Sequence, residues 1–328
     1  MKTVSFICIS FFVSYLSFGQ HADNFQSLIK QTKAYFSIYD TLYPNGDEYF
    51  PINKLGLSKD EIKQVILNYN GEDNTLSKNK DSILQYGAIE ILQTCIIKNI
   101  KKIAAHPDFS KNDITALFAN SGLYIVKSDD NKLYNFSFDS KNGGTYQMQI
   151  SIMHYTDYNL NQPNTVNTSQ SQDSGTDFSF ADDGYSKIYT IYTKEGTKYL
   201  LAGSVKKCST CYGSYISLIK FRENKFVQEF YYSIDLRDYE TGISYDPKAK
   251  IISVSYKTDD LTADCVCENA GDEKEEQGRV DEVILETEEE VLDEEDDVPI
   301  TRQCSCTFVF DGSNFMLRKK SSTIIETE

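Results

Sequence analysis

The sequence has few of the residue types on which familiar kinds of binding and catalysis depend. Its 328 residues include no Trp, 3 His and 6 Pro. Without Trp, the chain lacks the side chain with the largest flat face for stacking on sugars. Histidine is the usual general base and metal ligand near neutral pH, and the chain has only 3 of them. Sugar recognition stays an alternative because of the 23 Tyr and 19 Phe, although packing explains alternating Tyr and Phe in strands.

Motifs of the common enzyme classes are absent as well. The sequence contains no Gly-x-Ser-x-Gly, His-Glu-x-x-His, Walker or Gly-x-Gly-x-x-Gly pattern. His21 falls near the expected start of the mature chain, His106 at a predicted helix end and His154 in a predicted strand. We therefore expect no cofactor and an exported, non-catalytic protein that binds a partner or interacts with the envelope. The alternative is a secreted hydrolase with two carboxylates in a cleft of the β domain, because a sequence does not show which acids face each other.

Positive charge is also scarce. Lys and Arg number 33 against 49 Asp and Glu, so the formal net charge is −16. We therefore expect no nucleic-acid partner, because such a binder needs a basic surface to release counterions and the sequence has no basic stretch. Most of the charge is local, because residues 268–297 alone carry −14 and leave −2 for the rest. We expect residues 268–298 to form a disordered acidic insertion, for which a calcium ion or a protein partner is the alternative.

Long apolar runs are confined to the start of the chain. Residues 1–19 have a basic Lys2, an apolar run and a small Gly19, which is the pattern of a secretory signal peptide. The run is shorter than the roughly 20 residues that span a bilayer, and no later segment approaches that length. The sequence thus predicts an exported protein without a transmembrane segment after signal removal.

Residues 20–121 carry helical patterns. Apolar residues recur at helical spacing over 23–39, after the capping box that begins at Ser58, and over 80–105, where Pro107 ends the helix. A short helix is expected at 113–119. This part of the chain is predicted to be a helical N-terminal region.

In residues 122–328 the apolar residues recur with a period of two, which is typical of strands. Val, Ile, Tyr, Phe and Thr, which strands favour, are also frequent there. Strands are predicted at 123–127, 132–139, 145–155, 187–193, 198–205, 214–222, 225–233, 251–258, 304–310 and 313–318. The short turns between them predict an antiparallel β-meander, and a polar loop is expected at 159–177. The fold class is therefore α+β, with a curled barrel or sandwich as the main expectation and propeller-like blades as the alternative.

Cysteine is the most specific signal. Cys8 belongs to the predicted signal peptide and Cys95 lies on an apolar helix face, where it is expected to be a buried hydrophobe. The other six form three close pairs: Cys208 and Cys211, Cys265 and Cys267, and Cys304 and Cys306.

In an exported protein these six cysteines are expected to form structural disulfides. If the last two pairs lie on antiparallel neighbours, Cys265 bonds Cys306 and Cys267 bonds Cys304. A structural zinc site built from Cys208, Cys211 and a second pair, and a redox-active Cys208-x-x-Cys211, are the alternatives.

Overall fold

The computed structural model describes residues 24–69, 75–157, 166–167, 184–222, 225–237, 242–258, 265–267 and 300–326. The predicted signal peptide and the acidic insertion, with its expected cation or protein partner, lie outside the described residues. So does the polar loop at 159–177, except for Val166 and Asn167, which form a short strand.

Helices dominate the described part of the chain before residue 121. They are α1 (Phe25–Tyr39), η1 (Ile52–Lys54), α2 (Lys59–Asn68), α3 (Gln85–Ala104), η2 (Phe109–Lys111) and α4 (Ile114–Leu117), with a small hairpin of β1 (Tyr49–Pro51) and β2 (Ser82–Leu84).

The predicted capping box is confirmed. The Glu61 backbone N–H donates to Ser58 Oγ (3.3 Å) and the Ser58 backbone N–H donates to Glu61 Oε2 (2.8 Å). The predicted helix at 80–105 begins later than expected, at Gln85. Its first residues are instead drawn into pairing with β1, where Ile83 lies opposite Phe50.

The rest of the described chain consists of antiparallel strands. They are β3 (Tyr124–Lys127), β4 (Leu133–Asp139), β5 (Gln149–Tyr155), β6 (Val166–Asn167), β7 (Lys187–Thr193), β8 (Gly196–Lys206), β9 (Cys211–Arg222), β10 (Lys225–Arg237), β11 (Gly242–Asp246), β12 (Ile251–Thr258), β13 (Ile300–Phe310) and β14 (Phe315–Glu326). The sequence patterns missed β11, which is five residues long and half-exposed.

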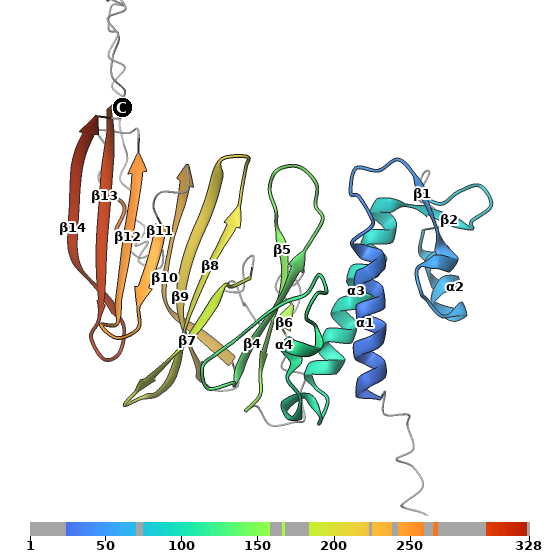
Figure 1. Ribbon diagram of the computed structural model, residues 1–328, viewed down its shortest axis with the longest axis horizontal. Helices are drawn as coiled ribbons and strands as arrows, with labels where there is room; N and C mark the ends of the chain where they lie inside the picture. The colour runs from blue at the N-terminus through green and yellow to red at the C-terminus, as the bar shows by residue number, and fades with distance from the viewer. Residues whose placement is uncertain are drawn as a thin grey trace, which may run out of the picture.

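These strands form three four-stranded meanders in chain order. We call them the first sheet (β3-β4-β5-β6), the second sheet (β7 to β10) and the third sheet (β11-β12-β13-β14). The three sheets and the helices follow one another along the long axis of the molecule, with the helices at one end and the third sheet at the other (Figure 1). The α+β class is confirmed, and the sheets stack as in a sandwich rather than closing into a barrel.

Three buried clusters hold the layers together. One joins the helices to the first sheet, including Phe36, Leu92 and Phe138. Another lies between the first and second sheets, with Leu133 and Tyr199 among its members. The third lies between the second and third sheets. Each sheet therefore buries apolar side chains against the next layer, which explains why so many Tyr and Phe are needed for packing.

Gly203 in β8 allows a close approach inside the second sheet. The Tyr215 ring lies against its Cα, and the Tyr215 hydroxyl donates to the Gly184 carbonyl. A Cβ at residue 203 would overlap both the ring and that carbonyl.

No helix within the described ranges combines the length and the apolar character that crossing a membrane requires.

Candidate functional site

The six predicted site cysteines lie in two separate parts of the fold. Cys208 and Cys211 form a disulfide at the turn between β8 and β9 in the second sheet, with their Cα atoms 4.8 Å apart. The Cys208 backbone N–H also donates to the Cys211 carbonyl (3.2 Å), so the bridge closes a hairpin turn. Cys211 begins a strand, whereas a redox-active thiol is normally activated at a helix N-terminus.

The other four cysteines join residues 265–267 to β13. The bonds run from Cys265 to Cys304 and from Cys267 to Cys306, with Cα separations of 5.6 and 5.7 Å. The pairing expected from sequence, in which Cys265 bonds Cys306 and Cys267 bonds Cys304, is therefore wrong.

The reason is that β12 and β14 occupy both edges of β13. Residues 265–267 cannot pair with β13 in the sheet plane, so they lie over its face and run in the same direction. The Tyr232 hydroxyl of β10 donates to the Val266 carbonyl (2.5 Å), which places this segment between the second and third sheets. The four sulfurs thus belong to the buried core of that layer, away from Cys208 and Cys211, with which a zinc site would have to combine them.

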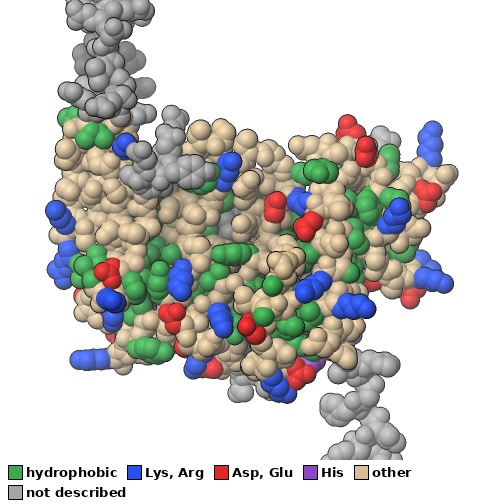
Figure 2. Space-filling view, viewed as in Figure 1, with side chains coloured by type: hydrophobic (Ala, Val, Ile, Leu, Met, Phe, Trp, Pro, Cys, Tyr) green, Lys and Arg blue, Asp and Glu red, His purple; other side chains and the backbone are tan. Residues whose placement is uncertain are grey.

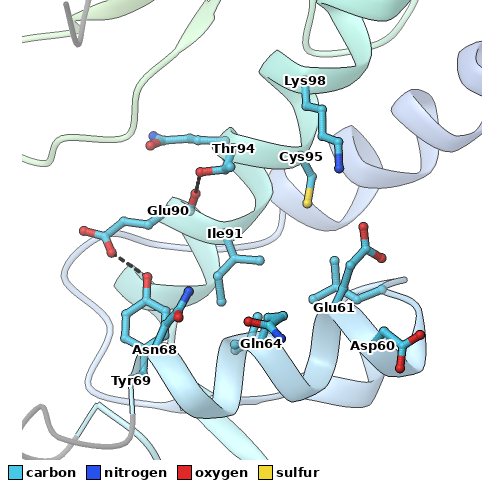
Figure 3. Close-up of a pocket in the computed structure, with 13 residues that line it drawn as sticks. Asp60, Glu61, Gln64, Asn68, Tyr69, Glu90, Ile91, Thr94, Cys95 and Lys98 are labelled. Atoms are coloured by element: carbon cyan, nitrogen blue, oxygen red, sulfur yellow. Dashed lines mark hydrogen bonds between the residues drawn. The ribbon is translucent and has the colours of Figure 1, made fainter. Parts of the chain in front are cut away.

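A cavity of about 650 Å³ lies elsewhere, between α2 and α3 (Figure 3). We call it the α2–α3 cavity. Its apolar lining comes from Leu57, Val65 and Ile91, of which Val65 and Ile91 are buried. Helical spacing produces the site: Gln64 and Asn68 stand one turn apart on α2, and Glu90, Thr94 and Lys98 stand one turn apart on α3.

One end of the α2–α3 cavity is closed by hydrogen bonds. The Tyr69 hydroxyl, just after α2, donates to Glu90 Oε2 on α3 (2.8 Å). The Thr94 hydroxyl donates to the Glu90 carbonyl (3.0 Å), and both bonds are drawn in Figure 3. The Tyr69–Glu90 bond links the end of α2 to α3, the Thr94 bond lies within α3, and the amides of Gln64 and Asn68 stand along the wall.

The other end holds Cys95, Glu61 and Lys98 (Figure 3). Burial raises the pKa of the Cys95 thiol, the Glu61 carboxylate raises it further, and Lys98 acts in the opposite direction. Cys95 is thus a protonated thiol at neutral pH rather than an activated nucleophile. It is half-buried and lines a cavity, whereas the sequence placed it in the core.

The Glu61 carboxylate accepts hydrogen bonds at the N-terminus of its own helix, α2. Hydrogen bonds from the Ser58 backbone and side chain lower the pKa of the Glu61 carboxyl. A general acid needs the opposite shift, because it must still hold its proton near neutral pH. The arrangement can therefore bind a molecule through apolar contacts and hydrogen bonds, and its thiol and its capping carboxylate are in the wrong protonation states for nucleophilic or acid catalysis.

A second cavity, of about 320 Å³, shares Glu90 and Gln93 with the first. Its other walls come from the loops around Asn45 and Asn142. The Gln93 amide donates to the Tyr39 hydroxyl (3.1 Å) and to the Ser140 carbonyl (2.5 Å), so this side chain joins the helices to the end of β4.

The two histidines in the described part of the chain are structural. His106 Nδ1 accepts the Asp108 backbone N–H (3.1 Å) just beyond α3. His154 in β5 is packed against Phe109, with ring centroids 4.8 Å apart, and burial lowers its pKa to about 4. Neither lines the α2–α3 cavity.

One pattern in the sequence of α3 corresponds to a wall of this cavity, although it does not predict the cavity by itself. Glu90, Thr94 and Lys98 form a polar stripe on α3, beside Cys95, which the sequence places on an apolar helix face. A helix that is apolar on one side and has a stripe of hydrogen-bonding groups beside it is compatible with plain solvent exposure. This polar stripe of α3 lines a cavity only because α2 lies opposite it.

The fold and the site together define a class: a disulfide-bonded α+β protein built from three stacked antiparallel sheets under a helical layer that contains a cavity. Among the residues that the structure describes, no group of three or more His, Cys, Asp or Glu is placed to hold a metal ion. Comparison with family models, with curated proteins and with solved structures finds no match to this chain.

Proposed function

We propose that this chain is an exported binding protein and that the α2–α3 cavity is its ligand site. The observation that carries the proposal is the composition of that cavity, in which apolar Leu57, Val65 and Ile91 are combined with the uncharged polar groups of Gln64, Asn68 and Thr94. Small-molecule sites are typically concave, largely apolar and supplied with a few polar groups that orient the ligand. The charged side chains of Asp60, Glu61, Glu90 and Lys98 also line the cavity. The ligand is accordingly an organic molecule with an apolar body and hydrogen-bonding groups.

Export is supported by the disulfides. Six of the cysteines are joined in three bonds, and such bonds persist in oxidising compartments. The signal-peptide pattern of residues 1–19 agrees with this location. N-terminal sequencing of the protein recovered from outside the cytoplasm tests export directly, with a mature chain that starts near Gln20 as the expected result.

Two substitutions by Trp test whether the cavity is the binding site. Ile91→Trp fills the cavity with a bulky ring, and Leu67→Trp places the same ring on the solvent side of α2, where Leu67 is 65% exposed. The probe is Nile red, an uncharged apolar fluorophore, titrated into the intact protein and both variants. We expect the Ile91→Trp variant to lose probe binding and the Leu67→Trp variant to retain it. Equal binding by both variants contradicts the proposal.

A further inference from the structure

We propose that the outer edge of β14 binds an extended acidic segment of another protein, which joins the third sheet as an added strand. This surface lies at the end of the molecule opposite the helices and is independent of the α2–α3 cavity (Figure 1).

The first observation is the position of β14 in its sheet. It pairs with β13 from Phe310 opposite Phe315 to Ile300 opposite Glu326. It is the last strand of the third sheet, and within the described part of the chain no strand pairs with its other edge. At 12 residues it is also long for an edge strand, and it contains no Pro.

The second observation is the direction of its backbone groups. Phe310 donates its backbone N–H to Lys250, toward β12. Because backbone groups of successive strand residues point alternately to the two sides, the odd-numbered residues of β13 bond toward β14. Ser322 and Ile324 lie opposite the even-numbered Cys304 and Arg302. Their N–H and C=O groups therefore point away from β13, as a template for another strand.

The third observation is the character of the side chains along this edge. Residues 316–324 are all exposed. Leu317 and Ile324 are 41% and 61% exposed, and the basic residues Arg318, Lys319 and Lys320 follow Leu317 directly. Lys and Arg side chains project from the margin of the molecule that β14 forms (Figure 2).

The charges select the occupant. Lysines on an edge strand oppose pairing between copies of the same edge, because like charges are brought together. The same charges attract a strand that carries carboxylates, and strand addition supplies main-chain hydrogen bonds whatever the partner's sequence. Leu317 and Ile324 add apolar contacts for alternate side chains of the partner. A strand in which acidic and apolar residues alternate matches the outward backbone groups, the basic side chains and the apolar side chains of this edge.

The test is fluorescence anisotropy of a labelled peptide of alternating Glu and Val, titrated with the intact protein. A peptide of alternating Lys and Val is the charge control. We expect the Glu peptide to bind, the Lys peptide not to bind, and the affinity for the Glu peptide to fall as salt is raised. Failure of the Glu peptide to bind, or equal binding of both peptides, overturns the proposal.

Two variants locate the binding. Ser322→Pro removes the outward N–H and should weaken binding about tenfold, while Ser322→Ala keeps that N–H and should bind as the parent protein does. In case the proline variant does not fold, the double variant Arg318→Glu, Lys319→Glu provides a second test. It should weaken binding about tenfold or more, whereas the same charge change at the exposed Lys30 and Lys33 of α1 should have little effect.

Two outcomes overturn the proposal, the first for the place of binding and the second for the occupant. If the folded Ser322→Pro variant and the Arg318→Glu, Lys319→Glu variant bind the peptide as the parent does, the peptide binds elsewhere. If the parent protein self-associates and Ser322→Pro abolishes this, the occupant is a second copy of the chain rather than an acidic partner.

Discussion

Lys198 in β8 and Glu229 in β10 form an ion pair inside the second sheet, with 2.6 Å between Lys198 Nζ and Glu229 Oε2. The Lys198 side chain is 1% exposed. Its ammonium also donates to the Ser313 carbonyl (2.7 Å), in the turn between β13 and β14, so one buried cation links the second sheet to the third.

Removal of this cation should be costly. Lys198→Ala leaves the Glu229 carboxylate partly buried without its partner, and we expect a loss of about 3 kcal/mol in the free energy of unfolding. Urea denaturation measures it. Lys220→Ala is the control, because Lys220 pairs with the half-exposed Glu195 and should contribute much less. A loss as small as that of Lys220→Ala would refute the linking role of Lys198.

His154 should make stability depend on pH. Its folded-state pKa of about 4 lies below the ordinary value of 6.5, because burial disfavours the charged ring. The unfolded chain therefore takes up a proton at a higher pH than the folded protein does. Stability is fully present above pH 6.5 and is lost as the pH falls toward 4, by about 3 kcal/mol in total.

Chemical denaturation between pH 7 and pH 4 checks this dependence, with His154→Phe as the comparison. The Phe variant lacks the titrating ring in the same apolar site, so its stability should fall less over this range. Parallel curves for the two proteins would show that another group is responsible.

Cys95 should be a slow thiol that responds to its two charged neighbours in opposite directions. Burial and the Glu61 carboxylate raise its pKa, and Lys98 lowers it. Glu61→Gln should therefore speed alkylation by iodoacetamide at neutral pH, and Lys98→Met should slow it, because the thiolate is the reacting form. Rates that change in the same direction in both variants would contradict this electrostatic account.

The disulfide pairing of residues 265–267 can be checked by counting thiols. Replacement of both Cys265 and Cys304 by Ser removes one bond and should leave Cys95 as the free thiol among the cysteines that the structure describes. Replacement of both Cys265 and Cys306 breaks two bonds and should expose Cys267 and Cys304 in addition.

The thiols are titrated with Ellman's reagent in denaturant without reductant. The opposite ranking of the two double variants would restore the pairing that the sequence suggested. Re-formation of a bond between Cys267 and Cys304 is detected by mass spectrometry of the alkylated protein.

The sequence by itself determined the local structure of this protein. The capping box at Ser58, the helical period that leads to α3, and the alternating strands with their short turns all depend on residues close together in the chain. For that reason the α+β class and most strand positions could be predicted, and β11 was missed because it is short and half-exposed.

Only the tertiary structure decided how distant segments meet. The bonds from Cys265 and Cys267 depend on β12 and β14 occupying both edges of β13, and the burial of Lys198 depends on where Ser313 lies. The α2–α3 cavity likewise arises because Tyr69 and Glu90 hold two helices side by side. Spacing along the chain determines which face of a helix or strand a residue occupies. It does not determine which other element covers that face, and the candidate site depends on α2 covering one face of α3.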